Sequence, residues 1–217
     1  DDRSLSSTSP IFRLMLTDGT SVAGCTGTVV NNSNVCISAG HCFAGSPALT
    51  AVAQFNVPMS SSAGVLNAPP IQHQYPVDMS TLQSENAGIG LDWAAFRLHP
   101  NNLSQTAFSQ QGARNAVAST ILPGTTLRVT GYGTDTTPDS TFNQVQQTAT
   151  GPFVGFLANV MTYQVDTEPG DSGAPIIREA TGDVIGIHTT GGCNTPGAVN
   201  FGTALSYAAI TTAITSL

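Results

Sequence analysis

The chain has 217 residues, of which only 9% are charged, and a net charge of −7. With six arginines and no lysine, we expect no nucleic-acid partner, because nucleic acids are bound mainly through basic side chains. No apolar run approaches the roughly 20 residues that span a bilayer, so we expect no membrane partner either.

The 22 glycines and 13 prolines, together with many Ser, Thr and Asn residues, favour short strands joined by polar turns, and therefore an all-β fold. In the first half, short apolar runs bounded by turn residues predict strands over residues 11–16, 22–30, 35–37, 49–55, 71–77 and 91–98. The turn at Asp18-Gly19 is typical of a hairpin between the first two strands.

A polar, turn-rich segment over residues 100–117 predicts a connection between two halves, which we place at 1–105 and 106–217. The second half predicts further strands over residues 126–132, 144–149, 161–165, 174–178, 184–188 and 198–205. Apolar residues then recur at near-helical spacing, which predicts a terminal helix over 207–217.

Ser172 lies between Asp171 and Gly173, in a stretch that also contains Gly170. A serine hydroxyl is a poor nucleophile unless a histidine accepts its proton and a carboxylate orients that histidine. Glycines allow a tight turn, which would leave the amide groups of Gly170 and Ser172 free to face a developing oxyanion. The same residue types are typical of an ordinary surface turn, so this stretch alone does not decide between the two interpretations.

His41 directly follows a predicted buried strand and precedes Cys42, which a disulfide to Cys25 would join to the preceding hairpin. Asp92 begins another predicted buried strand, and a buried carboxylate needs a hydrogen-bonding partner such as an imidazole. Asp78 is the competing carboxylate, although its surroundings are typical of an exposed loop. From these local patterns alone, purely structural roles for the histidine and for both aspartates remain open.

With His41, Asp92 and Ser172 in this chain order, the sequence resembles the chymotrypsin-like serine endopeptidases. The resemblance rests on motifs at residues 25–30, 38–42, 92–94, 129–133 and 170–175, and it extends over about residues 10–215. It implies two antiparallel six-stranded β-barrels with the active site between them. It also implies Ser172 as nucleophile, His41 as general base and then acid, Asp92 as its orienting group, and the amides of Gly170 and Ser172 as oxyanion donors.

The residues around the expected specificity pocket give two conflicting signals. Asp166 lies six residues before the serine, where trypsin-like members carry the aspartate that binds Arg or Lys. Thr167 and His188, however, fall where glutamyl endopeptidases bind a substrate carboxylate, and both side chains can donate hydrogen bonds. We therefore expect a preference for Glu or Asp before the scissile bond, with Asp166 orienting His188 from behind and with Thr189 and Gly191 also lining the pocket. The alternative, in which Asp166 binds Arg or Lys, stays open.

The segment Asp1-Asp2-Arg3 is similar to the region near the mature amino terminus of glutamyl endopeptidases. Trypsin-like members bury a new amino terminus against the aspartate that precedes the serine. Burying Asp1 against Asp171 would also bury a second carboxylate, so we expect a different arrangement here. We interpret the chain as a mature, secreted protein.

We expect polypeptide substrates, a monomer and no cofactor. No closely spaced Cys and His array or dense acidic cluster indicates a metal site. A Cys36–Cys193 disulfide is not supported by any motif, so both thiols could be free. An inactive, protease-like binding module is a competing function. An esterase is disfavoured because its nucleophile would precede the acid and the histidine in the chain.

Overall fold

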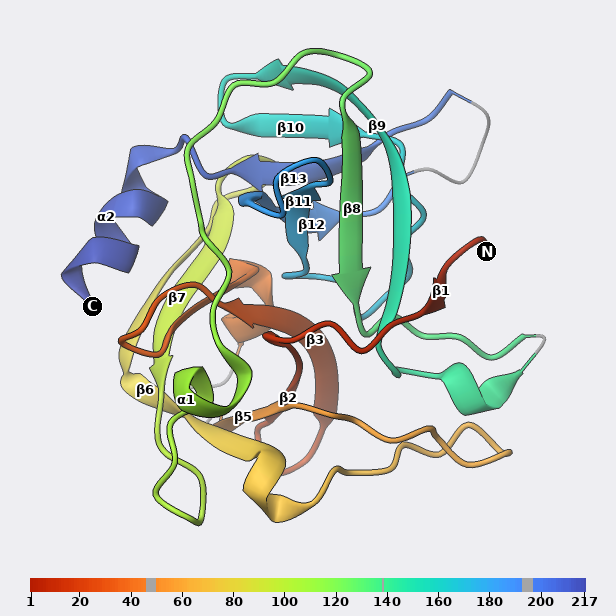
Figure 1. Ribbon diagram of the computed structural model, residues 1–217, viewed down its shortest axis with the longest axis vertical. Helices are drawn as coiled ribbons and strands as arrows, with labels where there is room; N and C mark the ends of the chain where they lie inside the picture. The colour runs from red at the N-terminus through yellow and green to blue at the C-terminus, as the bar shows by residue number, and fades with distance from the viewer. Residues whose placement is uncertain (46–49, 138, 193–196) are drawn as a thin grey trace.

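The computed structural model describes residues 1–45, 50–137, 139–192 and 197–217, and most of its regular structure consists of β-strands arranged as two barrels (Figure 1). The first barrel is closed in the order β2-β3-β4-β7-β6-β5, with antiparallel neighbours throughout. Its strands are β2 (Ile11–Thr17), β3 (Val22–Val29), β4 (Val35–Ser38), β5 (Thr50–Gln54), β6 (Gln74–Asn86) and β7 (Asp92–Leu98).

The second barrel follows the order β9-β10-β13-β12-β11-β8 and is closed by pairing of β8 with β9. Its strands are β8 (Thr126–Gly131), β9 (Gln147–Leu157), β10 (Val160–Tyr163), β11 (Pro175–Arg178), β12 (Val184–Thr190) and β13 (Asn200–Ala204). The expectation of two antiparallel six-stranded barrels is confirmed.

Three buried clusters explain why the strands pack in this way. The interior of the first barrel contains Phe12 and Phe96, and that of the second contains Leu127 and Phe153. A third cluster joins the barrels, with Trp93 of the first barrel among its members. Side chains of successive strand residues point to opposite faces, so one strand can contribute both to a barrel interior and to the surface between the barrels.

The two terminal segments cross between the barrels. The short strand β1 (Ser4–Leu5) pairs with β9 of the second barrel. The helix α2 (Ala208–Ser216) packs against β7 of the first barrel, beside which it lies in Figure 1. The predicted terminal helix is therefore confirmed. Among the described residues, no helix combines the length and the apolar composition needed to cross a bilayer.

Several elements differ from the expectations. β9 continues to Leu157 through glycine and proline residues that, in the sequence, indicate the end of a strand. β6 is likewise longer than expected, and Asp78 lies in it rather than in an exposed loop. The connection between the barrels contains α1 (Ala107–Gln111), which is capped at its start because the Thr106 hydroxyl accepts the Ser109 amide. Single 3-10 turns occur at η1 (Gly40–Phe43), η2 (Ile71–His73) and η3 (Ser140–Phe142).

Candidate active site

His41 and Asp92 meet because β4 pairs with β7, so that the turn after one strand lies beside the start of the other. The Oδ2 atom of Asp92 lies 2.6 Å from Nδ1 of His41, and Oδ1 accepts the His41 backbone amide at 2.9 Å. The aspartate side chain is only 8% exposed, whereas the imidazole is 35% exposed. The carboxylate therefore fixes both the ring and its backbone, while the Nε2 side of the ring is left for another partner.

Thr203 is a member of this site that the sequence did not reveal. Its hydroxyl donates to the backbone carbonyl of Asp92 at 2.7 Å, and it also accepts the Asp92 amide at 3.4 Å. Thr203 belongs to β13 of the second barrel, so this contact links the barrels at the aspartate. A single buried threonine within a strand carries no motif that could have indicated this role.

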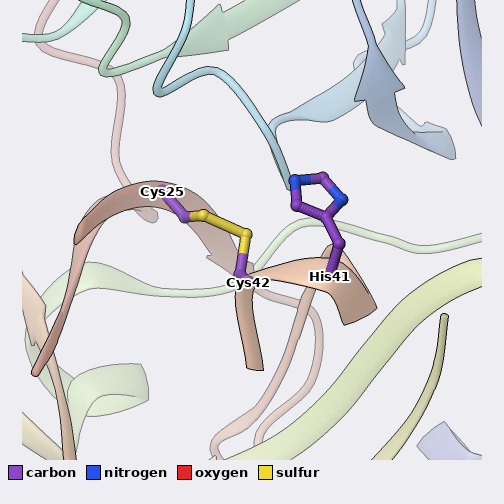
Figure 2. A group of neighbouring side chains, drawn as sticks. All are labelled: Cys25, His41 and Cys42. Carbon is purple, nitrogen blue, oxygen red and sulfur yellow. A yellow bond between two sulfur atoms is a disulfide. The ribbon is translucent and has the colours of Figure 1, made fainter. Parts of the chain in front are cut away.

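Cys25 and Cys42, the predicted pair, form a disulfide that joins β3 to the turn carrying His41. Figure 2 shows the sulfur–sulfur bond reaching from Cys42 to Cys25, with the imidazole of His41 leaving the neighbouring position of the same turn. Ligand atoms of these three residues lie within 4.8 Å of one another. Because a metal needs free thiolates, the oxidised pair is a structural link and does not form a metal site.

Ser172 follows β10 in a turn that is held against the first barrel. Its carbonyl oxygen accepts the Thr26 amide at 2.8 Å and lies 4.0 Å from Sγ of Cys42, the neighbour of His41. The flanking residues Gly170 and Gly173 have φ angles of 108° and 87°, a region that favours glycine. Three residues that are distant in sequence, His41, Asp92 and Ser172, are thereby brought to the junction between the barrels.

Among the described residues, the backbone before the serine turns so that two amides have no hydrogen-bond partner. Within the described part of the chain, the N–H groups of Gly170 and Ser172 donate to no acceptor, whereas Asp171 between them donates to Glu168 at 2.9 Å. The carbonyl of Gly170 is fixed by the Thr26 hydroxyl at 2.9 Å. Amides placed in this way beside a serine could donate to an oxyanion.

A cavity of about 550 Å³ adjoins the serine. It is lined by Asp166, Thr167, Glu168, Pro169, Ser172, His188 and Gly191. Of the five residues expected in the specificity pocket, Asp166, Thr167, His188 and Gly191 are brought together here. Thr189 does not line the cavity; its side chain is buried and its hydroxyl donates to the carbonyl of Phe201 at 3.4 Å. Alternation along β12 accounts for this, since neighbouring strand residues face opposite sides.

His188 is buried in the wall of the cavity. Its Nδ1 atom lies 2.5 Å from the hydroxyl of the buried Tyr163. Burial, and to a smaller extent the charge of His41, lowers the pKa of His188 to about 4. The imidazole is therefore neutral at neutral pH, with one hydrogen to donate.

Thr167 is held by Asn200 of β13. The Asn200 side-chain amide donates to the Thr167 hydroxyl oxygen at 2.8 Å and to the Val165 carbonyl at 2.6 Å, while its oxygen accepts the Gly192 amide at 2.7 Å. The Thr167 oxygen accepts from Asn200, and among the described residues no acceptor takes the hydrogen of the Thr167 hydroxyl, so that this hydrogen is available to a ligand. Neither Asn200 nor Tyr163 was predicted, since each acts through a pocket residue far away in the sequence.

The expectation that Asp166 orients His188 is wrong. The Oδ2 atom of Asp166 accepts the Asp2 backbone amide at 2.7 Å, and the Nδ1 partner of His188 is Tyr163. The amino-terminal segment returns to the second barrel beside the pocket and so provides this partner for Asp166. At Asp171, the expected departure from trypsin-like members is present, because its cationic neighbour is the Arg3 guanidinium.

Two further expectations concern residues outside this cluster. Asp78 is not near His41; it accepts hydrogen bonds from Ser80 and lies 3.8 Å from His99. Cys36 is a free, buried thiol whose pKa is raised by burial. Cys193 lies outside the described residues.

A model of the trypsin family matches residues 7–211. Among solved structures, a Glu endopeptidase in complex with MPD is 20% identical, with 100% of this chain and 96% of that chain covered at a TM-score of 0.74. Protease Anisep from Arthrobacter nicotinovorans is 16% identical, with 98% of this chain and 99% of that chain covered at a TM-score of 0.74. A thermostable serine protease, AL20, from an extremophilic microorganism is 16% identical, with 95% of this chain and 97% of that chain covered at a TM-score of 0.70. No curated protein matches the chain.

Proposed function

The chain belongs to the trypsin family and is a serine endopeptidase, and we propose that Ser172, His41 and Asp92 carry out its catalysis. The observation that supports this most directly is the 2.6 Å contact between Asp92 and Nδ1 of His41, beside a serine whose neighbouring amides are free. A disulfide is typical of proteins in oxidising compartments, and it supports action outside the cell.

In the proposed mechanism, the Ser172 oxygen forms a bond to the scissile carbonyl carbon while its proton passes to Nε2 of His41. The amides of Gly170 and Ser172 stabilise the oxyanion that forms. The carbon–nitrogen bond then breaks, and His41 gives its proton to the leaving amine. Water cleaves the acyl-enzyme by the same steps, and the Asp92 carboxylate stabilises the imidazolium in both halves.

The proposed substrate preference is Glu, or Asp, before the scissile bond. His188 and Thr167 support it, because each lines the cavity beside Ser172 and has a hydrogen to donate once its buried partner is satisfied. A substrate carboxylate can accept both hydrogens. An imidazole in the pocket wall also leaves less room for a long basic side chain.

Cleavage after Arg or Lys is the second candidate, and one observation favours it. Asp166 lines the same cavity, and its side chain is 27% exposed, so a cation could reach it. Against this, its Oδ2 atom already accepts the Asp2 amide.

Peptides that differ only in the residue before the cleaved bond decide between these candidates. We expect kcat/KM for the Glu peptide to exceed that for otherwise identical Gln and Arg peptides by at least about 100-fold, because neither can accept hydrogen bonds as a carboxylate does. Fast cleavage after Arg without cleavage after Glu would establish the trypsin-like alternative.

Labelling by a sulfonyl fluoride separates an active enzyme from an inactive binding module. We expect the reagent to modify Ser172 and to leave Ser172→Ala unmodified, as judged by intact mass. Failure to label the unmodified protein would favour a binding function.

A further inference from the structure

Asp171, the residue before the proposed nucleophile, is a buried carboxylate with few neighbours of opposite charge. It is 2% exposed, and burial raises its pKa to about 6. Its Oδ2 atom accepts the Glu168 backbone amide at 2.9 Å, while its own amide donates to the Glu168 carbonyl at 2.9 Å. The side chain thus closes the turn that contains Gly170, and displacing it would change the direction of the free amides.

Arg3 supplies the positive charge at this carboxylate. Its side chain is only 2% exposed, and Nη1 lies 3.5 Å from Oδ2 of Asp171. The other guanidinium hydrogens go to the Thr134 carbonyl at 2.8 Å and to the Asp1 carboxylate at 2.7 and 3.1 Å. Pairing of β1 with β9 brings Arg3 to this position, since β1 begins at the next residue.

Two glycines of the second barrel make room for this ion pair. A Cβ atom on Gly133 would lie 2.7 Å from Oδ2 of Asp171 and would also collide with Nη1 of Arg3. A Cβ atom on Gly131 would meet the other oxygen of the same carboxylate. The Gly-Tyr-Gly segment therefore forms a niche in which the carboxylate and the guanidinium approach each other.

We propose that Arg3 is a positioning residue for catalysis: its guanidinium holds Asp171 so that the Gly170 and Ser172 amides point to the oxyanion. An internal side chain, rather than a newly formed amino terminus, then provides the cation that orders the oxyanion turn. The proposal rests on the proposed function of Ser172. It differs from a purely structural role because losing the cation acts on the transition state more than on folding or substrate binding.

Replacing Arg3 tests this directly. In Arg3→Met we expect kcat for the Glu peptide to fall about 10- to 100-fold, with KM changed less than about threefold, as when oxyanion donors are lost. Arg3→Lys keeps a charge but loses the fork that also reaches Thr134, so we expect a smaller loss of about 3- to 10-fold. Arg128→Met is the matched control, because Arg128 also pairs with a carboxylate, Glu179 at 2.6 Å, but neither residue lines the cavity beside the serine.

The pH dependence of kcat and chemical rescue by a guanidinium compound are two measurements that would not change if the role of Arg3 were purely structural. Asp171 is faced by Arg3 from the amino-terminal segment and by Glu168 from its own turn. Without Arg3 the pKa of Asp171 rises further, so we expect the acidic limb of kcat to move to higher pH. Ethylguanidinium should restore activity to Arg3→Ala in a saturable manner, whereas equal concentrations of sodium chloride should not.

The outcomes separate this inference from the proposed function. If the unmodified protein is not labelled at Ser172, the proposed function fails. If it is labelled and Arg3→Met keeps kcat within about threefold of the parent, the role of Arg3 is refuted. Should Arg3→Met fail to fold by circular dichroism, the polar but uncharged Arg3→Gln decides: a folded variant that lacks the cation and still has an unchanged kcat and pH profile would refute the inference equally.

Discussion

Two histidines near the proposed nucleophile are held in the same manner by different partners. Nδ1 of His41, in the first barrel, lies 2.6 Å from the Asp92 carboxylate, and its ring is 35% exposed. Nδ1 of His188, in the second barrel, lies 2.5 Å from the Tyr163 hydroxyl, and its ring is buried.

The partner and the burial together determine what each ring can do. A carboxylate stabilises an imidazolium, so His41 can accept a proton and return it. A neutral phenol in a buried site gives no such help, and the pKa of His188 is lowered to about 4. His188 is therefore suited to donating a hydrogen bond to substrate without taking up a proton.

The largest effect should come from removing the carboxylate at His41. Asp92→Asn should lower kcat by about 10⁴-fold with little change in KM, because an amide favours the wrong tautomer and cannot stabilise the imidazolium. Steady-state kinetics on the Glu peptide measures this. Asp78→Asn is the matched control, since Asp78 lies 3.8 Å from the exposed His99 in the same barrel; a similar loss there would contradict the assignment.

A smaller effect is expected when His188, the histidine that pairs with Tyr163 and lines the cavity, is replaced. His188→Asn should reduce kcat/KM for the Glu peptide about 10- to 100-fold, the value of a hydrogen bond to a charged group. Hydrolysis of a small, unselective ester should be nearly unchanged. Equal losses on both substrates would mean that His188 serves the chemistry rather than the selection of Glu.

The partner of His188 should matter less than the ring itself. Tyr163→Phe should lower kcat/KM for the Glu peptide about 3- to 10-fold, because one neutral hydrogen bond is lost and the tautomer is no longer fixed. Nitrogen NMR of the ring should show a mixture of tautomers in this variant. Tyr75→Phe removes a buried phenol from the first barrel and should leave both measurements unchanged.

The last effect concerns stability rather than activity, and it should appear only in acid. With a pKa of about 4 in the folded state and an ordinary value of 6.5, His188 binds its proton more readily when unfolded. Its contribution to stability is therefore complete above pH 6.5 and is lost as pH falls towards 4, at no more than about 1.4 kcal/mol per pH unit. Asp171, whose pKa is raised to about 6, contributes in the opposite direction between pH 3.8 and 6.

Urea unfolding in a Ser172→Ala background, which prevents self-digestion, measures this dependence. His188→Asn should lose less stability between pH 6.5 and 4 than the parent does, because the titrating ring is gone while Asp171 remains. An identical pH dependence in both proteins would show that His188 is already protonated or exposed in the folded state.

Local sequence determined where most of the strands lie, though not the full extent of β6 and β9, and it determined the terminal helix and the residues proposed for catalysis. Ser172 with its glycines, His41 after a buried strand and Asp92 at the start of another each carry a signal within a few residues. Turn residues and apolar periodicity act over the same short range, so they can be recognised without knowing what packs against them.

Only the tertiary structure decided which partner each functional group has. Tyr163 rather than Asp166 contacts His188, Thr203 fixes Asp92, and Arg3 reaches Asp171 across 168 positions of sequence. The physical reason is burial: a buried polar group must be satisfied by whatever donor or acceptor the packed barrels bring to it. Strand pairing and the path of the amino-terminal segment determine that donor or acceptor, and neither leaves a local pattern in the sequence.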